Sequence, residues 1–184
     1  MRLTWLGHSS VVLDLDGVRV LTDPLLRSHA GPLRRLAPRP DPASWSRPDV
    51  VLLSHLHHDH AELRSLRMLP GATLMSAPEN VAWLRRRRRW RADPLTLRWC
   101  RSGVGPRLSA GHLTPETAAR AAAISGARFA IPVHWGTLHP PFVTHFARSW
   151  LELPGRRFAE AVAERAPGCT AVVLAPGQSW VAPA

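Results

Sequence analysis

The segment Ser54-His55-Leu56-His57-His58-Asp59-His60 contains four side chains, spaced as His-x-His-x-Asp-His, that can bind a metal ion. It follows residues 49–54 (DVVLLS), a nearly continuous apolar run whose length and composition predict a strand buried on both faces. A lone histidine is most often structural, but three aligned histidines and an aspartate at a strand end are far more specific. We interpret the segment as a metal-binding motif.

The spacing of the motif allows two pairs of ligands. Residues i and i+2 of an extended segment point to the same side, so His55 and His57 can converge on one ion. Asp59 and His60, which enter the following turn, can be directed towards a second ion. Imidazole and carboxylate groups suit zinc, and also iron or manganese. An ion with an open position lowers the pKa of bound water towards about 7, so a hydroxide oriented by Asp59 can attack a substrate at neutral pH.

The composition is that of a globular protein. The chain has 184 residues, of which 45% are apolar, and this predicts a single domain over residues 1–184 with a buried core. The N-terminal residues lack the apolar region of a signal peptide, and no run of eighteen uncharged apolar residues occurs. We therefore expect a cytoplasmic protein without a transmembrane segment. The two cysteines, Cys100 and Cys169, form neither a disulfide framework nor a Cys-x-x-Cys pair.

Alternating strand and helix patterns surround the motif and predict an α/β fold. Strands are expected at residues 2–6, 11–15, 18–21, 49–54, 73–75, 129–133 and 170–174, and helices at 61–68, 78–83, 115–126, 141–151 and 156–165. Asp16-Gly17 predicts a type I′ hairpin turn, and Thr114 before Pro115 predicts a helix N-cap. Residues 24–48 are rich in Pro and Arg, and we expect an extended surface loop there, with or without a helical turn, that could lie over a site.

Together with the motif, several other segments resemble the metallo-β-lactamase fold superfamily, in particular the branch that includes ascorbate-phosphate lactonase and N-acylphosphatidylethanolamine phospholipase D relatives. In chain order these segments are Leu6-Gly7-His8-Ser9-Ser10, Asp16-Gly17, Leu21-Thr22-Asp23-Pro24, Gly111-His112-Leu113-Thr114-Pro115-Glu116, Ile131-Pro132-Val133-His134-Trp135-Gly136-Thr137 and Leu174-Ala175-Pro176-Gly177. The resemblance covers residues 1–84 and 105–180. It implies a four-layer αββα sandwich with the metal ions at one edge of its two sheets.

The resemblance also implies roles for single residues. His55 and His57 match ligands of the first metal, and Asp59 and His60 match ligands of the second. His134 matches a late histidine on the second metal, and it also follows an apolar strand at a Gly-containing turn, where ligands are often placed. Three further residues, His8, Asp23 and His112, occupy positions that lie near the site in this branch. A hairpin-entry histidine, a turn aspartate and a neighbour of a helix cap are equally good interpretations of those three.

The sequence departs from the family pattern between His60 and His134. The pattern needs a third histidine for the first metal and an aspartate that bridges both metals, but this interval contains only His112 and Asp93, and neither matches. The interval is also shorter than that of the family by several dozen residues. We hypothesise that the aperiodic residues 85–104 mark an internal deletion, with or without local out-of-frame translation, that truncates the sandwich in its middle. A continuous, well-patterned reading frame through this part of the gene would contradict the hypothesis.

Three functions remain open at this point. The leading hypothesis is a zinc hydrolase, with one or two ions and with Mn²⁺ or Fe²⁺ as alternatives, that uses metal-bound hydroxide on an ester, phosphoester, lactone or amide of a small molecule or lipid headgroup. The second is a catalytically impaired remnant of the same family. The third is a nucleic-acid-binding protein or nuclease, because residues 85–107 contain nine arginines against one acid, with tryptophans interleaved. A solvated helix end explains the arginines at least as well, so nucleic acid is the least favoured partner.

Overall fold

The computed structural model describes residues 1–86, 92–94, 113–139 and 149–183, and the chain divides into two compact units. Unit 1 comprises Met1–Arg98, Thr137–Thr144 and Ala175–Ala184, and unit 2 comprises Trp99–Gly136 and His145–Leu174. Each unit has its own cluster of buried apolar residues. The single domain over residues 1–184 stays a prediction.

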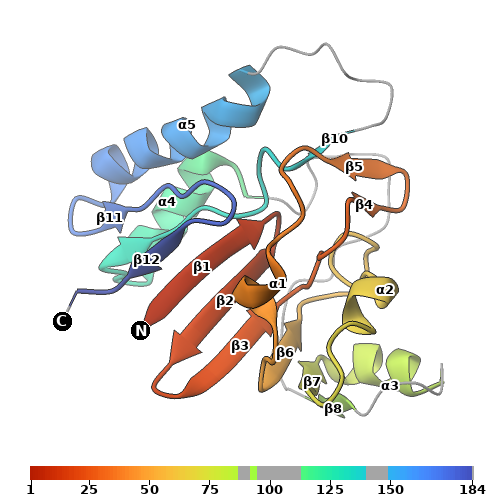
Figure 1. The fold of residues 1–184 in the computed structure, drawn as a ribbon. Coiled ribbons are helices and arrows are strands. Elements are labelled where there is room, and N and C mark those ends of the chain that lie inside the picture. The colour runs from red at the N-terminus through yellow and green to blue at the C-terminus, as the bar shows by residue number, and fades with distance from the viewer. Residues whose placement is uncertain (87–91, 95–112, 140–148, 184) are drawn as a thin grey trace. The chain divides into compact units, whose positions relative to one another are not determined.

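The main sheet of unit 1 has seven strands (Figure 1). In spatial order they are β12 (Ser179–Val181), β1 (Arg2–Gly7), β2 (Ser10–Leu15), β3 (Val18–Thr22), β6 (Val50–Leu53), β7 (Thr73–Ser76) and β8 (Ala92–Pro94). The strands from β12 to β3 pair antiparallel, whereas β3, β6, β7 and β8 run parallel. The sheet is therefore mixed, and the predicted α/β class is confirmed.

Local sequence explains the β2–β3 hairpin. Asp16 and Gly17 both have positive φ angles, 47° and 93°, as a type I′ turn requires. The strands on either side pair in continuous register from Val11 opposite Thr22 to Leu15 opposite Val18. The predicted hairpin is confirmed.

The strand before the motif, β6, differs from its prediction in one respect. Val51 and Leu53 are buried in the core of unit 1, but Val50 and Leu52 are only half-buried. The predicted burial on both faces is therefore found on one face and only partly on the other, because an apolar run does not show how much of each face is covered. Thirteen buried residues form this core: Leu6, Val12, Leu21, Leu26, Trp45, Val51, Leu53, Ala61, Leu66, Leu69, Leu74, Val81 and Leu84.

Two helices follow β6 in unit 1. Helix α2 (Leu63–Leu66) is shorter than the predicted 61–68, because the Glu62 carboxylate accepts hydrogen bonds from the backbone N–H groups of Arg64 and Ser65 and so caps the helix there. Helix α3 (Pro78–Arg86) begins at the predicted proline and continues past the predicted end at residue 83.

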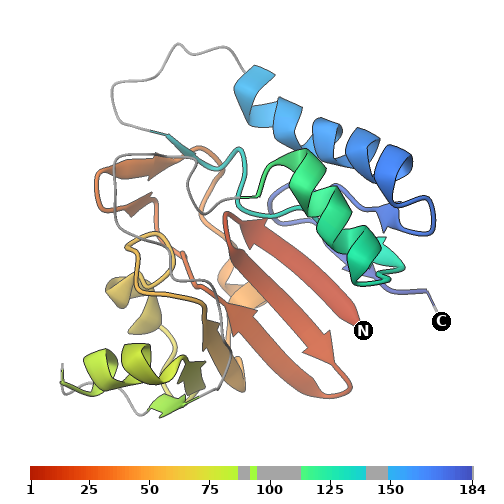
Figure 2. The same cartoon turned by 180° about the vertical axis from the view of Figure 1, so that it is seen from behind.

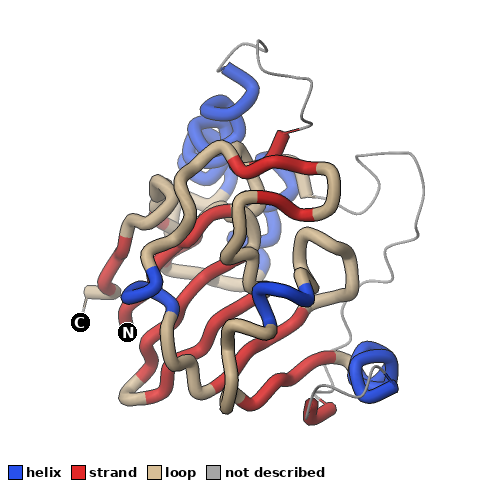
Figure 3. Tube along the Cα trace, turned by 45° about the vertical axis from the view of Figure 1, so that its right-hand side comes forward, coloured by secondary structure: helices blue, strands red, loops and turns tan. Residues whose placement is uncertain are grey.

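The prediction of an extended surface loop at residues 24–48 is wrong for its strands and buried leucines, whereas the helical turn that the prediction allowed is present as α1 (Pro42–Trp45). This stretch also contains β4 (His29–Ala30) and β5 (Leu33–Arg35), and β5 also pairs with β10 (Leu138–His139) in a three-stranded sheet. Figure 3 shows these short strands in red beside the loops that join them. Leu25 and Leu26 are almost fully buried. The pairing of β5 and β10 joins segments about a hundred residues apart, which a local pattern does not indicate.

Unit 2 is built from α4 (Pro115–Ile124), β9 (Phe129–Ala130), α5 (Ser149–Arg165) and β11 (Thr170–Ala171). The two helices lie side by side (Figure 2), and β9 and β11 pair parallel. The buried residues of this unit are Ala119, Phe158, Ala161, Val162 and Ala166. The strands predicted at 129–133 and 170–174 are thus shorter than expected, and the helix predicted at 156–165 begins earlier, at Ser149.

The predicted N-cap of α4 is confirmed, because the Thr114 hydroxyl accepts a hydrogen bond from the Thr117 N–H at 3.3 Å. Most of the helix predicted at 141–151 lies outside the described residues. The same is true of most of the hypothetical deletion junction at 85–104.

Among the described residues, no helix is both long enough and apolar enough to cross a membrane. The cytoplasmic location stays a prediction.

Candidate metal centre

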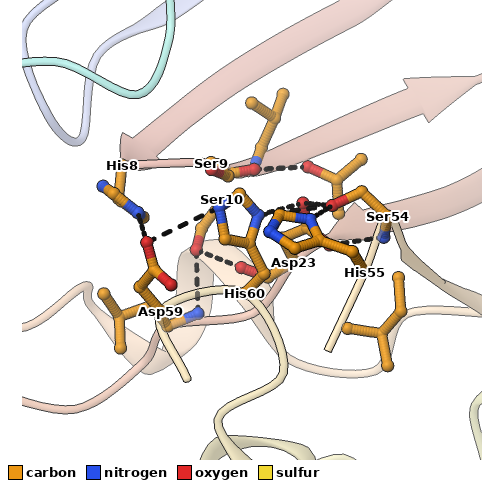
Figure 4. Close-up of polar contacts among 12 residues, drawn as sticks. His8, Ser9, Ser10, Asp23, Ser54, His55, Asp59 and His60 are labelled. Carbon is orange, nitrogen blue, oxygen red and sulfur yellow. Dashed lines mark hydrogen bonds and ion pairs between the residues drawn. The ribbon is translucent and has the colours of Figure 1, made fainter. Parts of the chain in front are cut away.

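Three strands of unit 1 end at the site. Strands β1, β3 and β6 all run in the same direction, so their C-terminal ends meet at one edge of the sheet. His8, Asp23 and Ser54 are the residues that follow these strands directly. Figure 4 shows the three residues together with the end of the histidine motif. The topology therefore collects polar side chains from three distant parts of the sequence.

A buried carboxylate organises one side of the site. Asp23 Oδ1 accepts the Ser54 N–H at 2.7 Å, and Asp23 Oδ2 accepts the Ser54 hydroxyl at 2.6 Å and His60 Nδ1 at 2.8 Å. Asp23 and His60 are 5% and 6% exposed. Because Nδ1 of His60 faces Asp23, its Nε2 faces the other side of the site. A carboxylate behind an imidazole is the arrangement that fixes the tautomer and orientation of metal-binding histidines.

Asp59 lies between two imidazoles. Its Oδ2 is 2.9 Å from His8 Nε2 and 3.6 Å from His60 Nε2. One ligand atom from each of the three residues lies within 4.8 Å of the others. Burial by itself would raise the pKa of the Asp59 carboxyl, but the hydrogen bond with His8 and the electrostatic effect of His60 outweigh it and hold that pKa well below its usual range. The Asp59 carboxyl is therefore ionised at neutral pH, and its role as a metal ligand stays a prediction.

The first histidines of the motif form a second group around His60. The ring centroids of His55 and His57 are 4.4 Å apart, and those of His55 and His60 are 4.0 Å apart. Ser54 Oγ lies 2.9 Å from His55 Nδ1. Burial, with smaller effects of His60 and His57, lowers the pKa of His55 to about 4. His55 is therefore neutral at pH 7, the form in which imidazole binds a metal ion.

The backbone is unusual at several predicted site residues. His8, Asp23 and His134 have positive φ angles of 54°, 35° and 69°. Such angles are uncommon for residues other than glycine, and they concentrate at functional sites. For His8 and Asp23, the strained backbone coincides with side chains that contact the motif.

The other predicted site residues have different outcomes. His134 belongs to unit 2, and its role as a ligand stays a prediction. His112 lies outside the described residues. Ser54 is the residue whose part the sequence reasoning missed, because the motif was analysed only for its metal-binding side chains. Its position between the strand end and the first histidine was the available signal.

The comparison with known families agrees with this geometry. A family model described as the beta-lactamase superfamily domain matches residues 2–134, which is well over half of the chain. The chain belongs to the beta-lactamase superfamily. The resemblance to metallo-β-lactamase-fold proteins expected from the sequence is thus confirmed.

Curated relatives in the superfamily match over less than half of this chain. A metal-dependent hydrolase of Methanopyrus kandleri is 39% identical over 80 residues, which is 43% of this chain and 32% of that protein. The N-acyl-phosphatidylethanolamine-hydrolyzing phospholipase D 1 of Caenorhabditis elegans is 35% identical over 72 residues, 36% of this chain and 20% of that protein. An uncharacterized Mycobacterium tuberculosis protein is 35% identical over 77 residues, 39% of this chain and 21% of its own. The chain therefore matches a third or less of each relative's length.

Solved structures show the same fold over nearly the whole chain. An isothiocyanate hydrolase from Delia radicum gut bacteria superposes with a TM-score of 0.69 at 14% identity, covering 98% of this chain and 99% of that one. Igni18, a metallo hydrolase from Ignicoccus hospitalis, has a TM-score of 0.66 at 15% identity and covers 97% of both chains. At such identities the similarity shows the fold, and the predicted metallo-β-lactamase-like α/β fold is confirmed.

Proposed function

We propose that the protein is a metal-dependent hydrolase that binds one or two divalent cations, with zinc as the first candidate and Mn²⁺ or Fe²⁺ as alternatives. The observation that carries the proposal is the ionised Asp59 beside His60, whose other ring nitrogen is anchored on the buried Asp23. The Methanopyrus kandleri relative, named as a metal-dependent hydrolase, and Igni18, named as a metallo hydrolase, support the same reaction class.

The residues present fit such a cation. Asp59 Oδ2 and His60 Nε2 would hold one ion, and His55 and His57 would hold another, with His134 as the further ligand that the family resemblance implies. Imidazole nitrogens and carboxylate oxygens are the donors that zinc prefers at catalytic sites. When bound, a cation of this kind supplies Lewis acidity and lowers the pKa of water.

The chain's own side chains would orient the reactants. Asp59 stays ionised, so it can accept a hydrogen bond from a water molecule and align it for attack. Asp23 holds His60 in the tautomer with the proton on Nδ1, and Ser54 Oγ, which donates to Asp23, can accept from His55 Nδ1 in the same way. Both imidazoles then present Nε2 as a ligand atom.

The substrate class that we propose is an ester, phosphoester, lactone or amide of a small molecule or lipid headgroup. Phosphodiesters are the first substrates to test, because the matched Caenorhabditis elegans protein is named for hydrolysis of a phospholipid. Nucleic acid is the least favoured partner. Of the basic segment at 85–107, the structure describes only the exposed Arg85 and Arg86 at the end of α3 and the backbone of Ala92–Pro94.

Metal analysis and hydrolysis assays on the purified full chain test the proposal. We expect one or two equivalents of metal by elemental analysis, and hydrolysis of bis(p-nitrophenyl) phosphate or p-nitrophenyl acetate that a chelator abolishes and Zn²⁺ or Mn²⁺ restores. His57→Ala and His60→Ala should each lower this activity at least about tenfold, and the exposed His29→Ala serves as the matched control. No stoichiometric metal in any preparation, or activity untouched by His57→Ala, would refute the proposal. Stoichiometric metal without turnover of any substrate class would favour the impaired remnant.

A further inference from the structure

His8 is held rigidly at the end of β1. Its φ angle is 54°, and the preceding Gly7 has a φ of 105°, so two consecutive residues adopt left-handed conformations. The Trp5 indole N–H donates to the His8 carbonyl oxygen at 2.8 Å, and His8 is only 5% exposed. A left-handed backbone and a buried imidazole each cost folding free energy. Their presence at His8 indicates that the position of its ring is functionally important.

The His8 ring has the same layout as the ring of His60. His8 Nε2 lies 2.9 Å from Asp59 Oδ2, and its Nδ1 lies 3.4 Å from the hydroxyl of the buried Thr137. His60 Nε2 lies 3.6 Å from the same Asp59 oxygen, and its Nδ1 lies 2.8 Å from Asp23. Each ring therefore directs Nε2 to one shared carboxylate oxygen and Nδ1 to a protein oxygen that can accept its proton.

The distances suit coordination of a single ion. Zinc–nitrogen and zinc–oxygen bonds of about 2.0–2.1 Å place neighbouring ligand atoms of a tetrahedral ion about 3.3 Å apart. The two distances from Asp59 Oδ2, 2.9 and 3.6 Å, lie on either side of this value, and the third ligand distance is at most 4.8 Å. A role for His8 as a hydrogen-bond donor to Asp59 alone would not require its ring to lie beside that of His60 as well, yet the two ring centroids are 5.4 Å apart.

We propose that His8 Nε2 is a further protein ligand of the ion held by Asp59 and His60. This inference rests on the proposed metal-dependent function. As a ligand, His8 carries its ring proton on Nδ1 and donates it to Thr137, in the way that His60 donates to Asp23. The ion then has three protein donors from unit 1 that come from two distant segments of the sequence.

Zinc affinity and cobalt spectra test the inference. Zinc binding is measured by competition with a chromophoric chelator, and the visible absorption of the Co²⁺-loaded protein reports its ligand set. His8→Gln keeps an N–H donor for Asp59 but removes the imidazole ligand. We expect both His8→Gln and His8→Ala to lower zinc affinity about 100-fold and to change the cobalt spectrum, while His29→Gln, at an exposed position, leaves both unchanged.

NMR spectroscopy of the wild-type protein provides a second test, which does not depend on whether the variants fold. Long-range ¹H–¹⁵N spectra of the zinc-loaded protein distinguish an Nε2-bound imidazole from one that carries its proton on Nε2. We expect the His8 ring to bind zinc through Nε2. A retained Nε2 proton on His8, or wild-type affinity and cobalt spectrum in His8→Gln, would overturn the inference and leave the proposed function standing. A wild-type protein that binds no zinc or cobalt would instead contradict both.

Discussion

Asp23 links the two groups of histidines in the site. Its carboxylate accepts from the backbone and hydroxyl of Ser54 and from His60, and Ser54 in turn lies beside His55. One buried anion thus contacts His60 directly and His55 through one hydroxyl. A change at Asp23 should therefore affect the ligands assigned to both ions.

Asp23→Asn tests this role. The amide has nearly the same shape, but its NH₂ group must face at least one hydrogen-bond donor that the carboxylate now accepts. We expect the free energy of unfolding to fall by about 1–3 kcal/mol and zinc affinity to fall about 10–100-fold, measured by urea denaturation and chelator competition. The control is Asp14→Asn, which removes the partly exposed ion pair with Arg19 and should cost at most about 1 kcal/mol. Unchanged zinc affinity in Asp23→Asn would show that Asp23 does not position His60.

The Gly7→Ala variant tests whether the backbone before His8 needs a glycine beside Arg35. A Cβ at Gly7 would lie 2.6 Å from Arg35 Nη2, and the φ of 105° is itself unfavourable for alanine. The Arg35 guanidinium cannot easily move away, because it also donates to the carbonyl oxygens of Leu6, Leu25 and Pro38. We expect Gly7→Ala to lower the free energy of unfolding by about 2–4 kcal/mol, measured by urea denaturation.

Gly71→Ala is the matched control for this change. Gly71 has a φ of 86°, but a Cβ at this position would have no atom within 4 Å, so only the backbone strain of about 1–2 kcal/mol remains. If Gly7→Ala and Gly71→Ala lose the same free energy of unfolding, the contact between the new Cβ and Arg35 does not contribute to the loss.

Among the elements, α5 depends on the absence of a side chain at one position. A Cβ at Gly155 would lie 2.7 Å from two ring atoms of Trp135, and 3.0 Å from Val173. Alanine is favoured over glycine within an open helix by about 1 kcal/mol, but overpacking typically costs about 1–3 kcal/mol. We therefore expect Gly155→Ala to destabilise the protein in urea denaturation followed by tryptophan fluorescence.

Gly168→Ala is the corresponding control in unit 2, because no atom lies within 4 Å of a Cβ there and its φ is not in the left-handed region. We expect it to leave stability unchanged or to raise it by less than about 1 kcal/mol. A stabilising Gly155→Ala would show that Trp135 does not pack against this face of α5.

The arrangement of strands explains why the site forms where it does. Strands β1, β3 and β6 end at one edge of the sheet, and the residue after each strand carries a polar side chain of the site. Ligands placed just beyond the ends of parallel strands are supported by a hydrogen-bonded sheet, so their positions depend little on flexible loops.

For the whole molecule, metal binding should be coupled to folding. The ligands come from segments that are separated in the unfolded chain, so an ion that binds only the folded protein stabilises it by mass action. At free zinc about 100 times the dissociation constant, we expect a gain of about 2.7 kcal/mol in the free energy of unfolding, and a chelator should reverse it. Thermal unfolding with and without zinc measures the effect. His60→Ala should lose most of the gain and His29→Ala should keep it, whereas identical melting temperatures in zinc and in chelator would contradict the coupling.

Much of the fold could be predicted because its signals are local. The hairpin at Asp16-Gly17 follows from two residues that tolerate positive φ, and the start of α4 follows from Thr114 and the proline after it. The buried Arg35 could not be predicted in the same way. Its place in β5 depends on pairing with β10, and an arginine within a Pro-rich stretch normally indicates solvent exposure.

The sequence by itself predicted a metal-binding motif at residues 55–60 and determined the superfamily to which the chain belongs, because residue type and spacing over a few positions carry that information. Only the tertiary structure decided that Asp23 stands behind His60 and that His8 contacts Asp59. These pairs are separated by 37 and 51 positions. They meet because strands β1, β3 and β6 end at the same edge of the sheet, a consequence of strand order and direction that no local pattern contains.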